Sequence, residues 1–380
     1  MGLNSYDPES GNMTPLLILS VVLLSFANGA NDNFKGVATL WGSGLTTYHR
    51  AIAWGTGFTF IGSLAAIWLG SALAAKFSGA KLVDSGIATQ LPFLVAVALG
   101  AGCTVLLAAR LGLPIATTHS ITGALVGAGI TGAGFSHVKF AVLGKGVLLP
   151  LLFSPIVALV LTVAVQLLLN RFGWQKTIND CVCVDEPKAL MMTPGGVSAS
   201  SIVIAAPASL RLAPVAECQT GAEILRFSLA DGAHWFSGAA ISFARGLNDT
   251  PKIVAVLLVA AAYNAKLNYL AVAVAIAIGG VLGAARVAHT MSKKITPMAT
   301  REAVTANLMA AMLVAMASPF ALPVSTTHVT SGGIIGIGLL RRDEANWGKV
   351  REILLAWVAT LPLGAASASI IFTLIHLLRS

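Results

Sequence analysis

Two stretches of this 380-residue chain read almost alike, SFANGANDNFK at Ser25–Lys35 and SFARGLNDTPK at Ser242–Lys252. Seven of the eleven positions are identical, at a constant offset of 217 residues. A second pair follows in the same order, LPIATTH at Leu113–His119 and LPVSTTH at Leu322–His328. Two different polar motifs do not recur in the same order by chance, so the chain contains an internal duplication.

The sequence around these motifs is strongly apolar. Hydrophobic residues make up 56% of the chain and charged residues 10%, and the mean hydropathy is +0.83. Runs of at least about 18 apolar residues recur from Thr14 to Leu378, long enough to cross the hydrocarbon layer. Continuous runs favour helices over the alternating strands of a barrel. We therefore predict an all-α, multi-pass protein of the cell membrane.

The hydrophobic runs fall into two sets of five. We predict a first transmembrane repeat at 14–170, an extramembrane linker at 171–231 with a short strand near 202–206, and a second repeat at 232–380. If each half crosses the membrane an odd number of times, the two homologous halves form an inverted repeat. Secondary transporters often have this arrangement, with broken and re-entrant helices around a site near the midplane.

The net charge of +9 comes from basic residues in the connecting segments, such as Lys293–Lys294 and Arg341–Arg342. This position indicates contact with lipid headgroups. We expect the lipid bilayer as a partner and no nucleic acid.

Only two of the fifteen carboxylates, Asp32 and Asp249, sit well inside apolar runs, and the duplication pairs them. A charge in the bilayer interior costs at least about 2.5–3.5 kcal/mol, so it is kept with a partner or a use. Structural ion pairs with Lys35, Arg245 or Lys252 are the simpler interpretation. Because Asn precedes Asp in both copies, we favour a binding site.

Glycine and proline surround the Asn-Asp pairs, at Gly29, Gly246 and Pro251. They predict broken helices, whose freed backbone groups are tolerated only where they line a cavity. These groups and the Asn-Asp side chains form an oxygen set suited to Na⁺; alternatively, the Asp takes a proton. The predicted cation-binding residues are Asn31, Asp32, Asn248 and Asp249.

The second motif supplies an anion site. Pro114 and Pro323 each precede small residues and a glycine-rich run, which is typical of a helix start. The first amides of a helix attract anions, and threonine hydroxyls add donors. Two such ends facing each other would hold a tetrahedral oxyanion. The predicted anion-binding residues are Asp32, Thr117, Thr118, Asp249, Ser325, Thr326 and Thr327.

Four further residues are predicted to support the site. His119 and His328 either donate to the anion or hold the motif's backbone, and Lys35 and Lys252 either neutralise the Asp pair or attract the anion. Histidine and aspartate lie far apart in each half without an i,i+4 ligand pair, so we expect no dedicated metal site beyond Na⁺. We expect no cofactor.

Together the motifs resemble the inorganic phosphate transporter (PiT) family, also called the phosphate permease or sodium-dependent phosphate transporter family. The halves of its members each carry Gly-x-Asn-Asp and Pro-[Val]-Ser-Thr-Thr-His motifs, which stand here as GANDNFKG with PIATTHSITG and GLNDTPKI with PVSTTHVTSG. The resemblance implies a homodimeric inverted-repeat symporter that carries phosphate with Na⁺ or H⁺. Two positions depart from the family pattern: Ala116 replaces the usual Ser, and Thr59 stands near a Glu of some members.

Other functions remain as alternatives to a coupled phosphate transporter. A sulfate permease of the same family is one, because sulfate is also a tetrahedral oxyanion. A membrane enzyme acting on a phosphorylated lipid would need a nucleophile and a base in unequal roles, whereas the polar residues here form symmetric pairs. A channel would conduct without obligatory coupling. We predict a secondary active transporter and not an enzyme.

Overall fold

The computed structural model describes residues 8–79, 82–83, 85–173, 181–185, 189–192, 202–205, 209–213, 223–260, 264–318, 320 and 322–379. The chain divides into two compact units. The first unit combines residues 1–165 and 237–380, and the second unit is residues 166–236.

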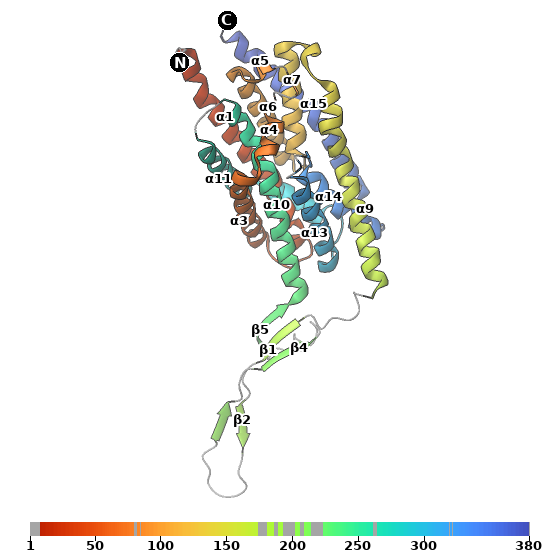
Figure 1. Cartoon of the computed structure of the whole chain (residues 1–380). Coiled ribbons are helices and arrows are strands. Elements are labelled where there is room, and N and C mark those ends of the chain that lie inside the picture. The colour runs from red at the N-terminus through yellow and green to blue at the C-terminus, as the bar shows by residue number, and fades with distance from the viewer. Residues whose placement is uncertain are drawn as a thin grey trace. The chain divides into compact units, whose positions relative to one another are not determined.

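The first unit is helical (Figure 1). Its first half contains α1 (Pro8–Asp32), α2 (Ala38–Gly42), α3 (Tyr48–Leu69), α4 (Ser71–Phe77), α5 (Ser85–Ala88), α6 (Leu91–Leu111), α7 (Thr117–Ala133), α8 (Phe140–Leu143) and α9 (Leu149–Arg171), with short turns η1 (Lys35–Val37), η2 (Phe135–His137) and η3 (Gly144–Leu148). Its second half contains α10 (Leu229–Val259), α11 (Ala265–Gly283), α12 (Ala285–Lys293), α13 (Thr300–Ala317), α14 (Thr326–Leu340) and α15 (Trp347–Leu377). Helices α9 and α10 continue into the second unit.

In the part of the chain that the structure describes, six helical segments are long and apolar enough to cross a membrane: Met13–Gly42, Tyr48–Leu69, Leu91–Leu111, Phe140–Arg171, Ala265–Gly283 and Trp347–Leu377. Their outward side chains are apolar. On α9, Leu152 is 66% exposed, and on α15, Val358 is 75% exposed. Such surfaces are stable against lipid and not against water. The chain is a multi-pass helical membrane protein, as predicted.

Helix contacts cross between the two halves. A Cβ atom added to Gly29 of α1 would lie 2.0 Å from the Ile276 carbonyl oxygen of α11, and one added to Gly246 of α10 would lie 2.1 Å from the Thr59 carbonyl oxygen of α3. Both pairs are equivalent under the offset of 217 residues. Each Asn-Asp helix therefore packs tightly on the helix that follows the other Asn-Asp motif.

The short helices α7 and α14 also pack against helices of the opposite half. A Cβ atom at Gly123 of α7 would lie 2.1 Å from the Leu361 carbonyl oxygen of α15. At the equivalent Gly332 of α14, it would lie 2.5 Å from the Pro155 carbonyl oxygen of α9. The short helix of each half thus packs against the last helix of the other half.

The predicted helix breaks at Gly29, Gly246 and Pro251 are wrong. Helix α1 continues through Gly29 to Asp32, and α10 continues through Gly246 and Pro251. The glycines instead allow backbone contact between helices. The ring of Pro251 packs at Gly70, where an added Cβ would lie 2.5 Å from its Cγ. In the first half the helix ends only after Asp32, where a turn leads into η1.

The second unit contains β-structure, so the all-α prediction is wrong for this unit. Strand β1 (Cys181–Asp185) pairs antiparallel with β4 (Ser209–Ala213) and with β5 (Glu223–Ser228), and β2 (Ala189–Met192) pairs with β3 (Ile202–Ala205). The segments CVCVD, SLRLA and EILRFS are too short for a span. They are rich in valine, isoleucine, leucine and phenylalanine, and short apolar runs of this kind are consistent with strands. The strand predicted near 202–206 is confirmed as β3.

Candidate functional site

Five charged side chains are buried among the described residues, and all belong to the Asn-Asp motifs: Asp32, Lys35, Arg245, Asp249 and Lys252. The two carboxylates are only 1% and 4% exposed. We call these five residues the charged cluster. With all five groups ionised, three cations stand against two carboxylates, which gives the cluster a formal net charge of one positive unit. That excess attracts an anion, and the attraction is strong because the surroundings exclude water.

Asp32, the last residue of α1, holds the start of α7. The Thr117 hydroxyl donates to Asp32 Oδ2 at 2.9 Å, and Asn28 Nδ2 donates to the same oxygen at 2.8 Å. The other carboxylate oxygen, Oδ1, forms an ion pair with the ammonium group of Lys35. The Asn-Asp motif and the second motif of the first half are therefore in direct contact.

The ammonium group of Lys35 has four oxygen acceptors. Besides Asp32 Oδ1, Nζ donates to Asn31 Oδ1 at 2.7 Å, to the Ile115 carbonyl oxygen at 2.8 Å and to Thr327 Oγ1 at 2.7 Å. Thr327 belongs to the other half and lies in the first turn of α14. Lys35 therefore joins the two halves at the site.

The second half repeats this pattern. Lys252 Nζ donates to Asp249 Oδ1 at 3.2 Å, to the Val324 carbonyl oxygen at 3.0 Å and, in the other half, to Thr118 Oγ1 at 3.0 Å. The Thr326 hydroxyl donates to Asp249 Oδ2 at 3.2 Å. Each contact is the repeat equivalent of one made by Lys35 or Asp32.

The two motif asparagines hold the loops before the short helices. Asn31 Nδ2 donates to the Leu113 carbonyl oxygen at 2.9 Å, and the Ile115 amide donates to Asn31 Oδ1 at 3.2 Å. Asn248 Nδ2 donates to the Val324 carbonyl oxygen at 3.1 Å. Their side-chain amides therefore fix where α7 and α14 begin, next to the charged cluster.

Arg245 is a member of the site that sequence reasoning treated only as an ion-pair partner. Its guanidinium donates to Asn28 Oδ1 at 2.6 Å, to Asn33 Oδ1 and to Thr59 Oγ1 at 3.3 Å, all in the other half. Its Nε lies 3.6 Å from Asp249 Oδ2. Arg245 occupies the position in the second repeat that is equivalent to Asn28 in the first. A basic residue in only one of the two copies was the sequence signal that could have revealed its role in the site.

The remaining hydroxyl of the second motif, Ser325, caps a helix. Its Oγ accepts a hydrogen bond from the His328 amide at 3.3 Å, at the N-terminus of α14. In the first half the equivalent residue is Ala116, and α7 begins without a side-chain cap. The departure from the family pattern at this position therefore removes a capping bond.

The two motif histidines meet each other across the halves. The His119 and His328 ring centroids are 4.7 Å apart, and the His328 ring lies 4.0 Å from that of Trp357. They line a cavity of about 700 Å³ whose other lining residues are apolar or glycine. Their predicted contact with an anion stays a prediction.

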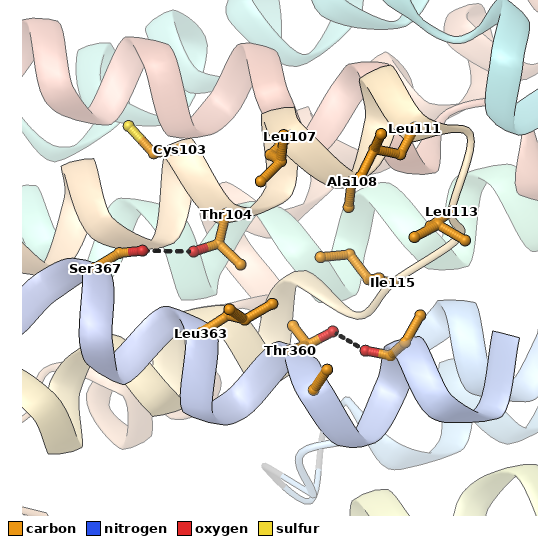
Figure 2. Close-up of a pocket in the computed structure, with 12 residues that line it drawn as sticks. Cys103, Thr104, Leu107, Ala108, Leu111, Leu113, Ile115, Thr360, Leu363 and Ser367 are labelled. Atoms are coloured by element: carbon orange, nitrogen blue, oxygen red, sulfur yellow. Dashed lines mark hydrogen bonds between the residues drawn. The ribbon is translucent and has the colours of Figure 1, made fainter. Parts of the chain in front are cut away.

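A smaller cavity of about 200 Å³ lies between α6 and α15 (Figure 2). Its lining is mostly leucine and alanine, with three hydroxyl residues, Thr104, Thr360 and Ser367. Thr104 and Ser367 hydrogen-bond to each other at 3.4 Å. None of its lining residues is charged, unlike those of the charged cluster.

Comparison with known proteins places the chain among transporters. The model of the phosphate transporter family matches residues 28–368. A probable low-affinity inorganic phosphate transporter of Rhizobium meliloti is 28% identical over 369 residues, which cover 94% of each chain. A putative phosphate permease of Pyrococcus horikoshii is 28% identical over 416 residues, covering 96% of this chain and 98% of that protein.

One solved structure has the same fold. It is titled the sodium-dependent phosphate transporter, and it superposes with a TM-score of 0.67 at 19% identity. The alignment covers 96% of this chain and 99% of that one.

Proposed function

Because the chain belongs to the phosphate transporter family, we propose that it moves inorganic phosphate across the membrane together with a cation, Na⁺ or H⁺. The family match confirms the predicted resemblance, and the matched relatives are named transporters and permeases, not enzymes. One observation carries the proposal. A buried cluster of two repeat-related Asp–Lys pairs, with the additional positive charge of Arg245, lies where two short helices begin.

The proposed phosphate site is formed by the starts of α7 and α14. Helix N-termini favour oxyanions through their free amides and dipoles, and the hydroxyls at both starts already contact the Asp–Lys pairs. Hydrogen phosphate keeps a hydroxyl that can donate to an aspartate, and sulfate has none. The proposed phosphate ligands are Asp32, Thr117, Thr118, Asp249, Ser325, Thr326 and Thr327.

The halves are proposed to form an inverted repeat with α7 and α14 as re-entrant helices. These helices have 17 and 15 residues, about 25 and 22 Å at 1.5 Å per residue, which is less than a hydrocarbon layer of about 30 Å. Both begin at the charged cluster. The crossed glycine contacts support a two-fold relation between the halves. Rocking of one half against the other would then open the site to each side in turn.

The cation is proposed to bind at Asn31, Asp32, Asn248 and Asp249. Their carboxylate and amide oxygens are hard ligands that suit Na⁺, and the aspartates are alternatively proton acceptors. The solved relative is titled sodium-dependent, and this title supports coupling without choosing the ion for this chain. The homodimer implied by the family resemblance also stays a prediction.

Uptake into proteoliposomes tests this function directly. The purified chain is reconstituted, and labelled phosphate uptake is measured while the Na⁺ and pH gradients are varied independently, with sulfate as competitor. We expect saturable phosphate uptake that one gradient drives and that excess sulfate does not block. Sulfate uptake without phosphate uptake would overturn the substrate, and uptake indifferent to both gradients would overturn the coupling.

A further inference from the structure

Each Asn-Asp motif contains a lysine whose ammonium group sits inside a shell of oxygen atoms. Around Lys35 Nζ the shell consists of a carboxylate oxygen, an amide oxygen, a backbone carbonyl and a threonine hydroxyl. Around Lys252 Nζ it consists of a carboxylate oxygen, a backbone carbonyl and a threonine hydroxyl. Both lysines are only 1% exposed.

These shells have the composition of a site for a hard cation. Carboxylate, carbonyl and hydroxyl oxygens are the ligands that such ions select. They also include oxygens of Asn31, Asp32 and Asp249, three of the four residues proposed to bind the coupling cation. An ammonium group and a Na⁺ ion compete for these oxygens, because they carry the same charge and would lie within a few ångström of each other in a buried site.

We propose that Lys35 and Lys252 are tethered cations that take the place of coupling Na⁺ ions, so that phosphate transport by this chain does not require Na⁺. The inference rests on the proposed function and narrows the choice of coupling ion from Na⁺ or H⁺ to H⁺. Each ammonium group compensates its aspartate and links its own half to the short helix of the other half, through Thr327 and Thr118. A bound ion would otherwise have to supply both effects.

The charge of the cluster supports the same conclusion. With the three cationic side chains present, the empty site already has one net positive charge. A Na⁺ ion beside each aspartate would raise it to three, and buried uncompensated charge is expensive. A phosphate carrying one or two negative charges brings the cluster to neutrality or to one net negative charge without any added ion.

The two-fold pattern argues against a chance contact. Lys35 and Lys252 are repeat equivalents, and so are their acceptors, the carbonyls of Ile115 and Val324. The duplication has kept a lysine in both copies while Asn28 and Arg245 have diverged. A purely structural lysine in one half would not need its counterpart to have the equivalent carboxylate, carbonyl and threonine acceptors.

The test measures labelled phosphate uptake in proteoliposomes with Na⁺ or with N-methylglucamine on both sides, under the same pH gradient. For the unmodified chain we expect rates that agree within about twofold. In Lys35→Asn and Lys252→Asn, the oxygen shell is vacated, and a neutral side chain remains. We expect uptake to fall at least about tenfold without Na⁺ and to recover when Na⁺ is supplied. Lys294→Asn is the control, because Lys294 is exposed at the end of α12.

The outcomes separate this inference from the proposed function. If phosphate uptake by the unmodified chain is lost when N-methylglucamine replaces Na⁺, the proposal of tethered cations is wrong and the proposed phosphate transport still holds. Absence of phosphate uptake under every condition would overturn the carrier itself. If both variants fail to fold, thermal unfolding of the unmodified chain decides. A saturable rise in Tm specific to Na⁺, at constant ionic strength, would contradict the inference, and no such rise is expected.

Discussion

Replacement of Arg245 by Asn, the residue that the first half carries at the equivalent position, tests whether the cluster's excess positive charge binds phosphate. The Nε atom lies 3.6 Å from Asp249 Oδ2, which corresponds to an attraction of about 4–5 kcal/mol at an effective dielectric constant of about 20. Removing one partner of a buried ion pair costs about 3–5 kcal/mol. The variant should therefore have a lower Tm. Its charged cluster would consist of two Asp–Lys pairs and carry no net charge.

The transport consequence follows from the lost charge. We expect KM for phosphate uptake by Arg245→Asn to rise at least about tenfold, which corresponds to about 1.4 kcal/mol. Arg245→Lys keeps the charge but loses the planar fork that reaches Asn28 and Asn33, so its KM should rise less. The control is Arg351→Asn, an exposed arginine of α15. Equal KM increases in the Asn and Lys variants would refute the charge argument.

Two further predictions use other parts of the structure. Asp32→Asn and Asp249→Asn should each abolish phosphate uptake, because each removes the charge opposite a buried lysine; unchanged uptake in both, with normal expression, would disprove the site. Gly62→Ala should lower the Tm of the purified protein, since its Cβ would lie 2.0 Å from a carbonyl oxygen of α10 and overpacking costs about 1–3 kcal/mol. Gly57→Ala in the same helix has open space around its Cβ and should leave the Tm unchanged or raise it, so equal Tm losses would contradict the packing argument.

The sequence predicted the membrane helices and the meeting of the two motifs because both leave local signals. Long apolar runs fix the helices, and the duplication points to Asp32 and Asp249 as a pair. The sequence assigned Asp32 and Thr117 to one predicted anion site, but their direct hydrogen bond across 85 residues was found only in the structure.

The backbone conformation around the glycines could not be predicted in the same way. Gly29 and Gly246 read as helix breakers because glycine lowers helix propensity. Their role depends on a neighbouring backbone that lies more than 180 residues away in sequence. Arg245 was underrated for a similar reason. Its acceptors Asn28, Asn33 and Thr59 all belong to the other half, and no local pattern reveals them.

The lysines also bear on how the carrier would move. Lys35 reaches Thr327 and Lys252 reaches Thr118, so neither half contains a complete cluster. Separating the halves at the site breaks these two lysine hydrogen bonds, each worth about 1.5–3 kcal/mol, as well as the Arg245 hydrogen bonds to Asn28, Asn33 and Thr59. Phosphate oxygens accept hydrogen bonds from ammonium and threonine groups alike, so a bound phosphate replaces what the moving halves lose. If Lys35 and Lys252 act as tethered cations, the substrate itself lowers the barrier to reorientation, because it binds more strongly to the site as the contacts between the halves part.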